Sequence, residues 1–247
     1  MVTVHIFNTL KKKASGCNKI KLAALIILFV LFSSSLIYAD VVHKDSKGFV
    51  YYLYVPTAYT TSQKYSLIVA LHWSTGRGMD MIERWKEPAE KYGYIIVCPD
   101  SANSNYWDIK VEDACLLRMI EEVTRDYSID KKRIFVTGFS AGGTYALYLG
   151  LTYADIFAAS APFAGSLKWL IKEAGVRPDK VRKQIPFCFV HGTNDITVDI
   201  KESYFGQQEL LKYGFKAVVK EASGLDHQYP AYISWTIAQW FNRQHIE

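Results

Sequence analysis

Apolar runs and amphipathic stretches alternate along this chain from about residue 49 to its end. Short runs rich in β-branched and aromatic side chains predict strands, and stretches with helical periodicity predict helices. The expected strands are 49–55, 65–71, 94–98, 133–137, 156–161, 187–190 and 217–219. The expected helices are 81–92, which Pro88 must kink or divide, 111–127, 144–151 and 233–241. This alternation predicts an α/β fold, with a mainly parallel sheet and helices on both faces.

A positively charged and then apolar segment precedes this alternating pattern. Its apolar run begins at Leu22, after several lysines, and the small Ala39 stands at the expected cleavage point. These are the parts of a secretory signal peptide, so we expect a leader over residues 1–39 and a single domain over 40–247 that is secreted or periplasmic. The run over 22–39 is close to the shortest that spans a bilayer, so an uncleaved anchor is the alternative, and it would be the chain's contact with a membrane.

The basic character of the chain belongs to this leader. The full sequence holds 29 basic and 24 acidic residues, and the leader carries five lysines and no acid, which leaves 24 of each sign in the remainder. A domain without net formal charge lacks the basic excess of nucleic-acid binding proteins, so no nucleic-acid partner is expected.

The cysteines left after the leader are odd in number. Cys98, Cys115 and Cys188 remain, so at least one thiol is unpaired within a monomer. Spacing does not tell which of them pair, and the alternatives are buried thiols or one bridge that involves Cys115. Histidines and cysteines show no metal-ligand spacing, so no metal is predicted.

A Gly-x-Ser-x-Gly pattern lies between the strand expected at 133–137 and the helix expected at 144–151. Ser140 is its serine, and Gly138 and Gly142 flank it. Strand, tight turn and helix together are the context of a nucleophile elbow, in which glycines remove bulk beside a strained serine. The alternative is a structural glycine turn.

A serine nucleophile needs a base that an acid holds in place, and in this architecture the acid precedes the histidine in the chain. Asp195 follows the strand expected at 187–190, and His227 precedes the last helix. We therefore expect Ser140 as nucleophile, His227 as general base and then acid, and Asp195 as the residue that orients the imidazole. The alternatives are that Asp195 only closes a turn, with Asp199 as a substitute acid, or that His227 is an exposed loop residue.

Four motifs together resemble the α/β-hydrolase fold family, and more narrowly its exported polyhydroxybutyrate depolymerase and feruloyl esterase group. They are Leu71-His72, Gly138-Phe-Ser-Ala-Gly-Gly143, His191-Gly-Thr-Asn-Asp195 and His227-Gln-Tyr-Pro230. The resemblance covers roughly residues 45–242. It implies serine-dependent hydrolysis of small or polymeric carboxylic esters without a cofactor.

Two backbone amides are expected to form an oxyanion hole. One is the N–H of Ala141, directly after the nucleophile, and the other is the N–H of Trp73, in the loop after the strand 65–71. The resembled family usually has glycine where this chain has Trp73, so the loop is expected to bend differently. His72 is expected to brace this loop, with a catalytic role as the alternative.

The sequence defines the substrate less closely than it defines the reaction. We expect an aromatic cleft suited to hydroxycinnamoyl esters, with core or surface packing as the alternative; its candidates are Trp73, Tyr106, Trp107, Trp169 and Tyr229. The segment 166–184 is either a cap over the site or a surface helix. A serine peptidase or a dienelactone-hydrolase-like enzyme on the same fold is the competing activity, and a non-catalytic binding protein is the competing class.

Overall fold

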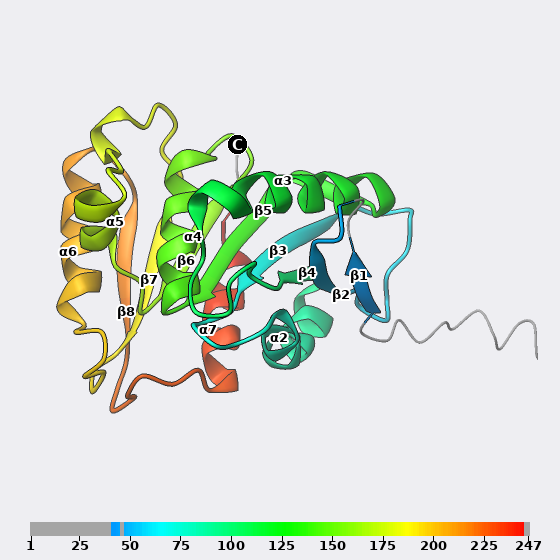
Figure 1. Cartoon of the computed structure of the whole chain (residues 1–247). Coiled ribbons are helices and arrows are strands. Elements are labelled where there is room, and N and C mark those ends of the chain that lie inside the picture. Colours follow the sequence, from blue (N-terminus) through cyan, green and yellow to red (C-terminus); the bar gives the residue numbers. More distant parts are fainter. Residues whose placement is uncertain (1–40, 45–46, 245–247) are drawn as a thin grey trace, which may run out of the picture. The chain divides into compact units, whose positions relative to one another are not determined.

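The computed structural model describes residues 41–44 and 47–244, so the predicted leader lies outside the described residues. Within these ranges the strands form one sheet of eight, in the order β1-β2-β4-β3-β5-β6-β7-β8 (Figure 1). Their bounds are β1 Val41–Lys44, β2 Val50–Tyr54, β3 Tyr65–Leu71, β4 Tyr94–Pro99, β5 Ile129–Phe139, β6 Ala159–Phe163, β7 Phe187–Gly192 and β8 Ala217–Ala222. β1 and β2 pair antiparallel, as do β2 and β4, and every other pair is parallel. The predicted α/β class with a mainly parallel sheet is confirmed.

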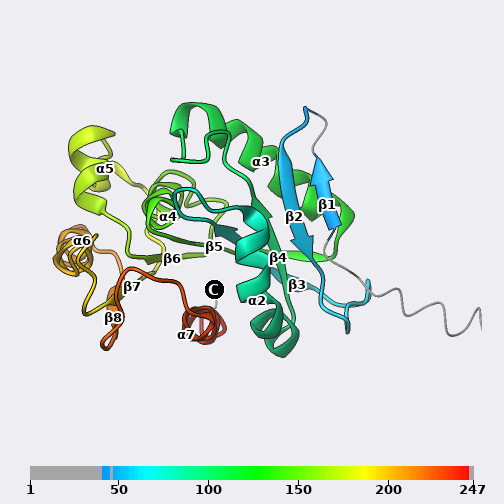
Figure 2. The ribbon, with the colours of Figure 1, turned by 60° about the horizontal axis from the view of Figure 1, so that its bottom comes forward.

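Helices cover both faces of this sheet. They are α2 Gly78–Tyr92, α3 Ile109–Asp126, α4 Ala141–Thr152, α5 Leu167–Glu173, α6 Lys201–Lys212 and α7 Ala231–Phe241, with a short 3₁₀ turn η1 at Pro178–Lys180. Figure 2 shows α2 and α7 on one side of the sheet, with α3 and α4 on the other. Side chains of β3 alternate between the two cores: Leu67 and Val69 pack with α3 and α4, and Ile68 and Ala70 pack with α2 and α7. Because β3 is covered on both faces, all of its residues are buried.

Several elements differ from the sequence-based expectation; β1 was not among the expected strands, and β5 begins four residues earlier than the expected strand 133–137. α2 begins earlier, at Gly78, and runs through Pro88 without dividing, because its apolar stripe with Met81 and Trp85 is fully buried and holds the helix against the sheet. β6 lies two to three residues later than expected. α6 was not expected, since its buried face consists largely of small or polar residues such as Ser203 and Gly206, which give little hydrophobic periodicity.

The chain reverses its direction of strand addition at β3. From β3 it passes to β4 on one side, and then returns to β5 on the other side of β3. The loops that leave the carboxyl ends of β3 and β5 therefore diverge, and such a point is where ligands bind in open α/β sheets. Trp73 and Ser140 lie in these two loops.

None of Cys98, Cys115 and Cys188 forms a disulfide in the part of the chain that the structure describes. The expected alternative of a bridge through Cys115 is therefore wrong, and Cys98 and Cys188 are buried thiols. Among the described residues, no helix has both the length and the apolar character that a bilayer span requires.

Candidate active site

Ser140 occupies a strained turn between β5 and α4. Its φ of 56° and ψ of −113° lie outside the regions that L residues normally adopt, at a cost of about 1–3 kcal/mol. The turn also requires close backbone approach. A Cβ at Gly142 would lie 2.4 Å from the carbonyl oxygens of Leu71 and His72, and one at Gly138 would lie 2.3 Å from the carbonyl oxygen of Gly142. Glycine at both positions thus allows the elbow to form directly against the end of β3.

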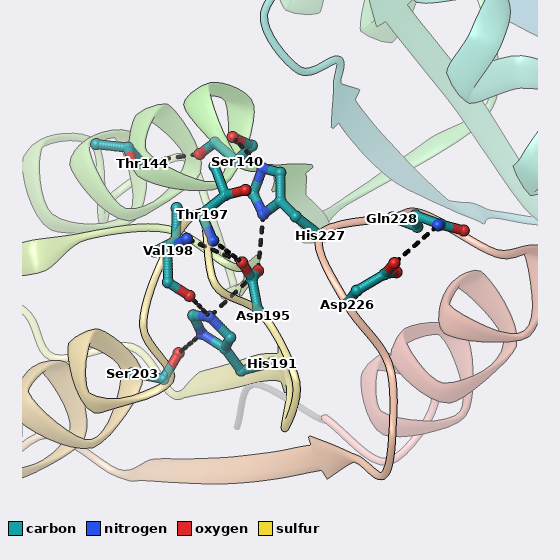
Figure 3. Close-up of polar contacts among 10 residues, drawn as sticks. All are labelled: Ser140, Thr144, His191, Asp195, Thr197, Val198, Ser203, Asp226, His227 and Gln228. Carbon is teal, nitrogen blue, oxygen red and sulfur yellow. Dashed lines mark hydrogen bonds and ion pairs between the residues drawn. The ribbon is translucent and has the colours of Figure 1, made fainter.

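Three predicted side chains from distant parts of the chain meet at this elbow (Figure 3). Nε2 of His227 lies 3.0 Å from Oγ of Ser140, and Nδ1 of the same ring lies 2.7 Å from Oδ2 of Asp195. A carboxylate only accepts hydrogen bonds, so Nδ1 carries the proton and Nε2 accepts the Ser140 hydroxyl. This is the tautomer that a general base at Ser140 requires.

Asp195 is held in place on both sides. Its side chain is 1% exposed, and Oδ1 accepts hydrogen bonds from the backbone N–H groups of Thr197 at 2.9 Å and Val198 at 2.8 Å. Asp195 therefore closes the turn after β7, as one alternative had it, and also presents Oδ2 to His227. The two roles are compatible because they use different oxygens.

The competing residues lie elsewhere. Asp199 is exposed and pairs with Lys201 at 3.1 Å, and Asp226 accepts a hydrogen bond from Gln228. His191 is fully buried, with Nδ1 2.7 Å from Oγ of Ser203 and Nε2 2.8 Å from the carbonyl oxygen of Val198. Burial lowers the pKa of His191, so the ring stays neutral and supports the loop that carries Asp195.

His72 braces the loop after β3, as expected. Its Nδ1 lies 2.7 Å from the carbonyl oxygen of Trp73, and its Nε2 accepts the backbone N–H of Ser101 at 3.0 Å. The indole Nε1 of Trp107 donates to the carbonyl oxygen of His72 at 2.9 Å. Burial lowers the pKa of His72, which keeps the ring neutral and both hydrogen bonds intact.

The two amides expected in an oxyanion hole are available. The backbone N–H groups of Trp73 and Ala141 donate to no acceptor within the described part of the chain. Trp73 does not take a positive φ; in this loop that conformation falls on Thr75, with a φ of 66°. A glycine directly after His72 would allow a positive φ at position 73, whereas in this chain the positive φ falls two residues later. Gly142 still packs against the start of the loop, at the carbonyl oxygens of Leu71 and His72.

Ser140 borders two hollows. The first, of about 350 Å³, is bordered by Tyr106, Trp107 and Trp169. The second, of about 570 Å³, is bordered by Trp73, His227 and Tyr229. The residues expected to line one aromatic cleft are therefore divided between two cavities.

The aromatic rings around these hollows are anchored by their polar ends. The hydroxyl of Tyr229 lies 3.1 Å from Oγ of Ser234 and accepts Nε1 of Trp85 at 3.2 Å. Trp107 stacks on Tyr145 at 5.2 Å between ring centroids. The rings of Tyr229 and Trp107 are almost fully buried and form fixed walls of the two hollows. Trp169, in α5, is half exposed, so the start of the segment 166–184 contributes one wall of the first hollow.

Two charged residues near the site were not anticipated from the sequence. Glu112, in α3, is buried, and its Oε1 accepts the backbone N–H of Ala102 at 3.0 Å, which fastens the loop that carries Tyr106 and Trp107. Burial raises the pKa of Glu112 to about 7. Arg84, in α2, borders the second hollow. Each lies in an amphipathic helix where a charged residue ordinarily faces solvent, so periodicity gave no signal for either.

Comparisons with known proteins agree with this fold. A family model described as phospholipase/carboxylesterase matches residues 99–241, more than half of the chain. The chain is 29% identical over 134 residues to "Probable acetylxylan esterase A" of Aspergillus fumigatus, an alignment that covers 49% of this chain and 36% of that protein. It is 32% identical over 165 residues to "Probable feruloyl esterase C" of Aspergillus terreus, covering 64% of this chain and 58% of that protein.

Among solved structures, the fold is similar to that of a CE1 ferulic acid esterase from Anaeromyces mucronatus in complex with ferulic acid. The TM-score is 0.67 at 18% sequence identity, over 83% of this chain and 89% of that one. The chain spans less than two thirds of the length of the two Aspergillus relatives.

Proposed function

Since this chain belongs to the phospholipase/carboxylesterase family of α/β-hydrolases, we propose that it is a serine carboxylesterase that works through an acyl-enzyme on Ser140. The observation that carries the proposal is the continuous set of hydrogen bonds from Ser140 through His227 to Asp195 at the elbow. Nothing in the proposed reaction calls for a cofactor.

In this proposal His227 takes the proton of Ser140 as the hydroxyl oxygen attacks the ester carbonyl. The N–H groups of Ala141 and Trp73 stabilise the oxyanion. The protonated imidazole then gives its proton to the leaving alkoxide, and Asp195 stabilises the imidazolium. Water, activated by the same imidazole, releases the acid and regenerates Ser140.

The position of His227 distinguishes the two hollows. The leaving oxygen must receive a proton from Nε2, so the alcohol portion has to lie on the side of the serine that His227 borders. His227 borders the second hollow and is absent from the lining of the first. The alcohol therefore occupies the second hollow and the acyl group the first.

The walls of the first hollow favour an aromatic acyl group. Tyr106, Trp107 and Trp169 offer ring faces, and the volume of about 350 Å³ lies at the small end of the range for small-molecule sites. The names of the relatives, an acetylxylan esterase and a feruloyl esterase, support esters of acetic or hydroxycinnamic acids on plant polysaccharide. Of these we propose hydroxycinnamoyl esters, in an exported enzyme whose leader is residues 1–39.

A panel of esters tests the activity and the acyl group. Purified protein is assayed with methyl ferulate and with nitrophenyl esters of acetate, butyrate and octanoate, alongside Ser140→Ala. Hydrolysis that is lost in the variant supports an esterase. A higher kcat/KM on methyl ferulate than on methyl butyrate, which has the same alcohol and an aliphatic acyl group, supports the aromatic acyl hollow. Rates that favour short aliphatic acyl groups and ignore ferulate would rule out the hydroxycinnamoyl proposal, and the absence of hydrolysis of every ester would rule out the esterase.

A further inference from the structure

Arg84 is the charged side chain of the hollow that receives the alcohol. It projects from α2, is half-buried, and borders that hollow together with Trp73 and Tyr229. The other residues that border this hollow are aromatic or neutral. A positive charge in such a wall requires a reason, because a partly desolvated cation is costly unless something compensates it.

The guanidinium of Arg84 is fixed rather than free to swing into solvent. Nε donates to the carbonyl oxygen of Tyr229 at 3.0 Å, and Nη1 donates to the carbonyl oxygen of Asp80 at 2.7 Å. Its central carbon lies 4.8 Å from the ring centroid of Trp73 and 5.8 Å from that of Tyr229. Backbone bonds at two nitrogens and two aromatic faces therefore hold the plane of the group beside the active-site serine.

These contacts leave Arg84 without a counter-ion. Both hydrogen-bond acceptors are neutral carbonyl groups, and Arg84 forms no ion pair with any carboxylate of the described residues. Of the acids close to it on α2, Asp80 accepts the backbone N–H of Arg77 at 2.9 Å and Glu83 pairs with Lys86 at 2.7 Å, and within the described residues no ion pair joins Glu87 to Arg84. Nη2 donates to no acceptor in the described part of the chain. A fixed guanidinium with an unused amino group is the arrangement that binds a carboxylate.

We propose that the second hollow is a subsite for an alcohol that carries a carboxylate, and that Arg84 recognises it. The preferred esters are then those whose leaving group is a hydroxy acid or an acidic sugar. This inference rests on the proposed function, because that function assigns the alcohol to this hollow. Arg84 acts here as a specificity residue and takes no part in the proton transfers.

Matched ester pairs test this subsite. We compare kcat/KM for 3-acetoxybenzoate with that for 3-acetoxybenzamide, which share the acyl group and differ in the charge of the alcohol, each normalised to its rate of hydroxide hydrolysis. We expect the wild type to favour the anionic ester by about tenfold or more, the range for a charge-assisted hydrogen bond. The preference should fall as the ionic strength rises, because salt screens the interaction. This arm requires no variant.

Variants then assign the preference to one side chain. In Arg84→Gln the anionic-to-neutral ratio should fall to about 1, and Arg84→Lys should retain part of it. The matched control is Lys91→Gln, which removes the same charge from the exposed surface of α2 and should keep the wild-type ratio. The same comparison with 3-acetoxybutyrate and with an acetylated hexuronic acid, each against its amide, shows which kind of acidic alcohol is preferred.

The outcomes separate this inference from the proposed function. If the enzyme hydrolyses neutral esters but shows no preference for the anionic ester of each pair, the proposed carboxylate subsite is wrong, whereas the proposed esterase activity is supported. A ratio that Arg84→Gln leaves unchanged, with both rates reduced equally, would mean that Arg84 only ties α2 to the loop of Tyr229. If no ester is hydrolysed, the proposed function itself is wrong.

Discussion

Nε2 of His227 lies 3.0 Å from Oγ of Ser140, although 87 positions separate the two residues in the chain. The contact arises because β5 and β8 end at the same edge of a parallel sheet, and each side chain stands in the loop that follows its strand. Asp195, after β7, lies between them in the order of the sheet. The site thus depends on the topology of the sheet more than on any single loop.

Replacing the acid should disable the base without unfolding the site. In Asp195→Asn the amide oxygen can keep the bonds from Thr197 and Val198, which leaves the NH₂ group facing Nδ1 of His227. That donor forces the proton onto Nε2, which can then no longer accept from Ser140. We expect kcat to fall by about 10²–10⁴, measured on the best ester of the panel.

Asp199→Asn is the matched control for this change. It alters an exposed carboxylate four positions away that pairs with Lys201, and kcat should stay within about twofold of wild type. A comparable loss in both variants would show that charge in this loop, rather than the contact with His227, sustains activity.

The stability of the domain should depend on pH through Glu112. Burial raises its pKa to about 7 in the folded state, whereas in the unfolded chain the pKa has its ordinary value of 4.5. Between these values the folded state binds more protons than the unfolded one, so the free energy of unfolding falls as the pH rises through this window, by about 3 kcal/mol in total. Glu112→Gln should abolish this contribution.

Urea unfolding at pH 5 and at pH 8 measures the effect. The free energy of unfolding of the wild type should fall between pH 5 and pH 8 by more than that of Glu112→Gln. The control variant Glu121→Gln, on the exposed face of α3, should show the same fall as the wild type. An identical pH dependence in wild type and Glu112→Gln would contradict the raised pKa.

A single methyl group at Gly142 should prevent the elbow from forming. The added Cβ would lie 2.4 Å from two backbone oxygens at the end of β3, and backbone cannot move aside as a side chain can. We expect Gly142→Ala to lower the free energy of unfolding by about 3 kcal/mol or more. Gly175→Ala, at a positive φ of 68° with open space around it, should cost only about 1 kcal/mol. Equal losses in the two variants, measured by urea unfolding, would argue against the close approach.

The first hollow should lose its preference for aromatic acyl groups when Trp169 is truncated. Trp169 is 50% exposed, so Trp169→Ala should fold normally while removing one ring face from the wall. We expect the ratio of kcat/KM for methyl ferulate to that for nitrophenyl acetate to fall by about two- to tenfold. Tyr232→Ala, equally exposed but on α7 and outside both hollows, should leave the ratio unchanged. An unchanged ratio in Trp169→Ala would place the acyl group elsewhere.

The elbow could be located from the sequence because its requirements are local. An apolar strand, two glycines and a helix surround Ser140 within a few residues, and Asp195 and His227 each follow a recognisable strand. The division of the aromatic residues between two hollows could not be predicted, since it depends on how the segments after β3, β4, β6 and β8 are arranged around Ser140.

Arg84 and Glu112 were missed for a related reason. Each lies in a helix whose periodicity predicts an exposed charge, and only the packing of that helix shows its environment. Arg84 reaches the site because α2 packs against α7 and the loop that precedes it, which brings its guanidinium to the backbone of Tyr229. Glu112 is buried because the loop of residues 101–108 folds back over the start of α3 and donates to its carboxylate.

Covalent labelling is the most direct test of whether Ser140 is a nucleophile that His227 activates. The protein is treated with a fluorophosphonate probe, and the adduct is followed by intact mass and located by peptide mapping. We expect one adduct per molecule on Ser140, none in Ser140→Ala, and labelling slowed by about 10³ or more in His227→Ala. A wild-type protein that takes up no probe, or an adduct that persists in Ser140→Ala, would contradict this role of Ser140.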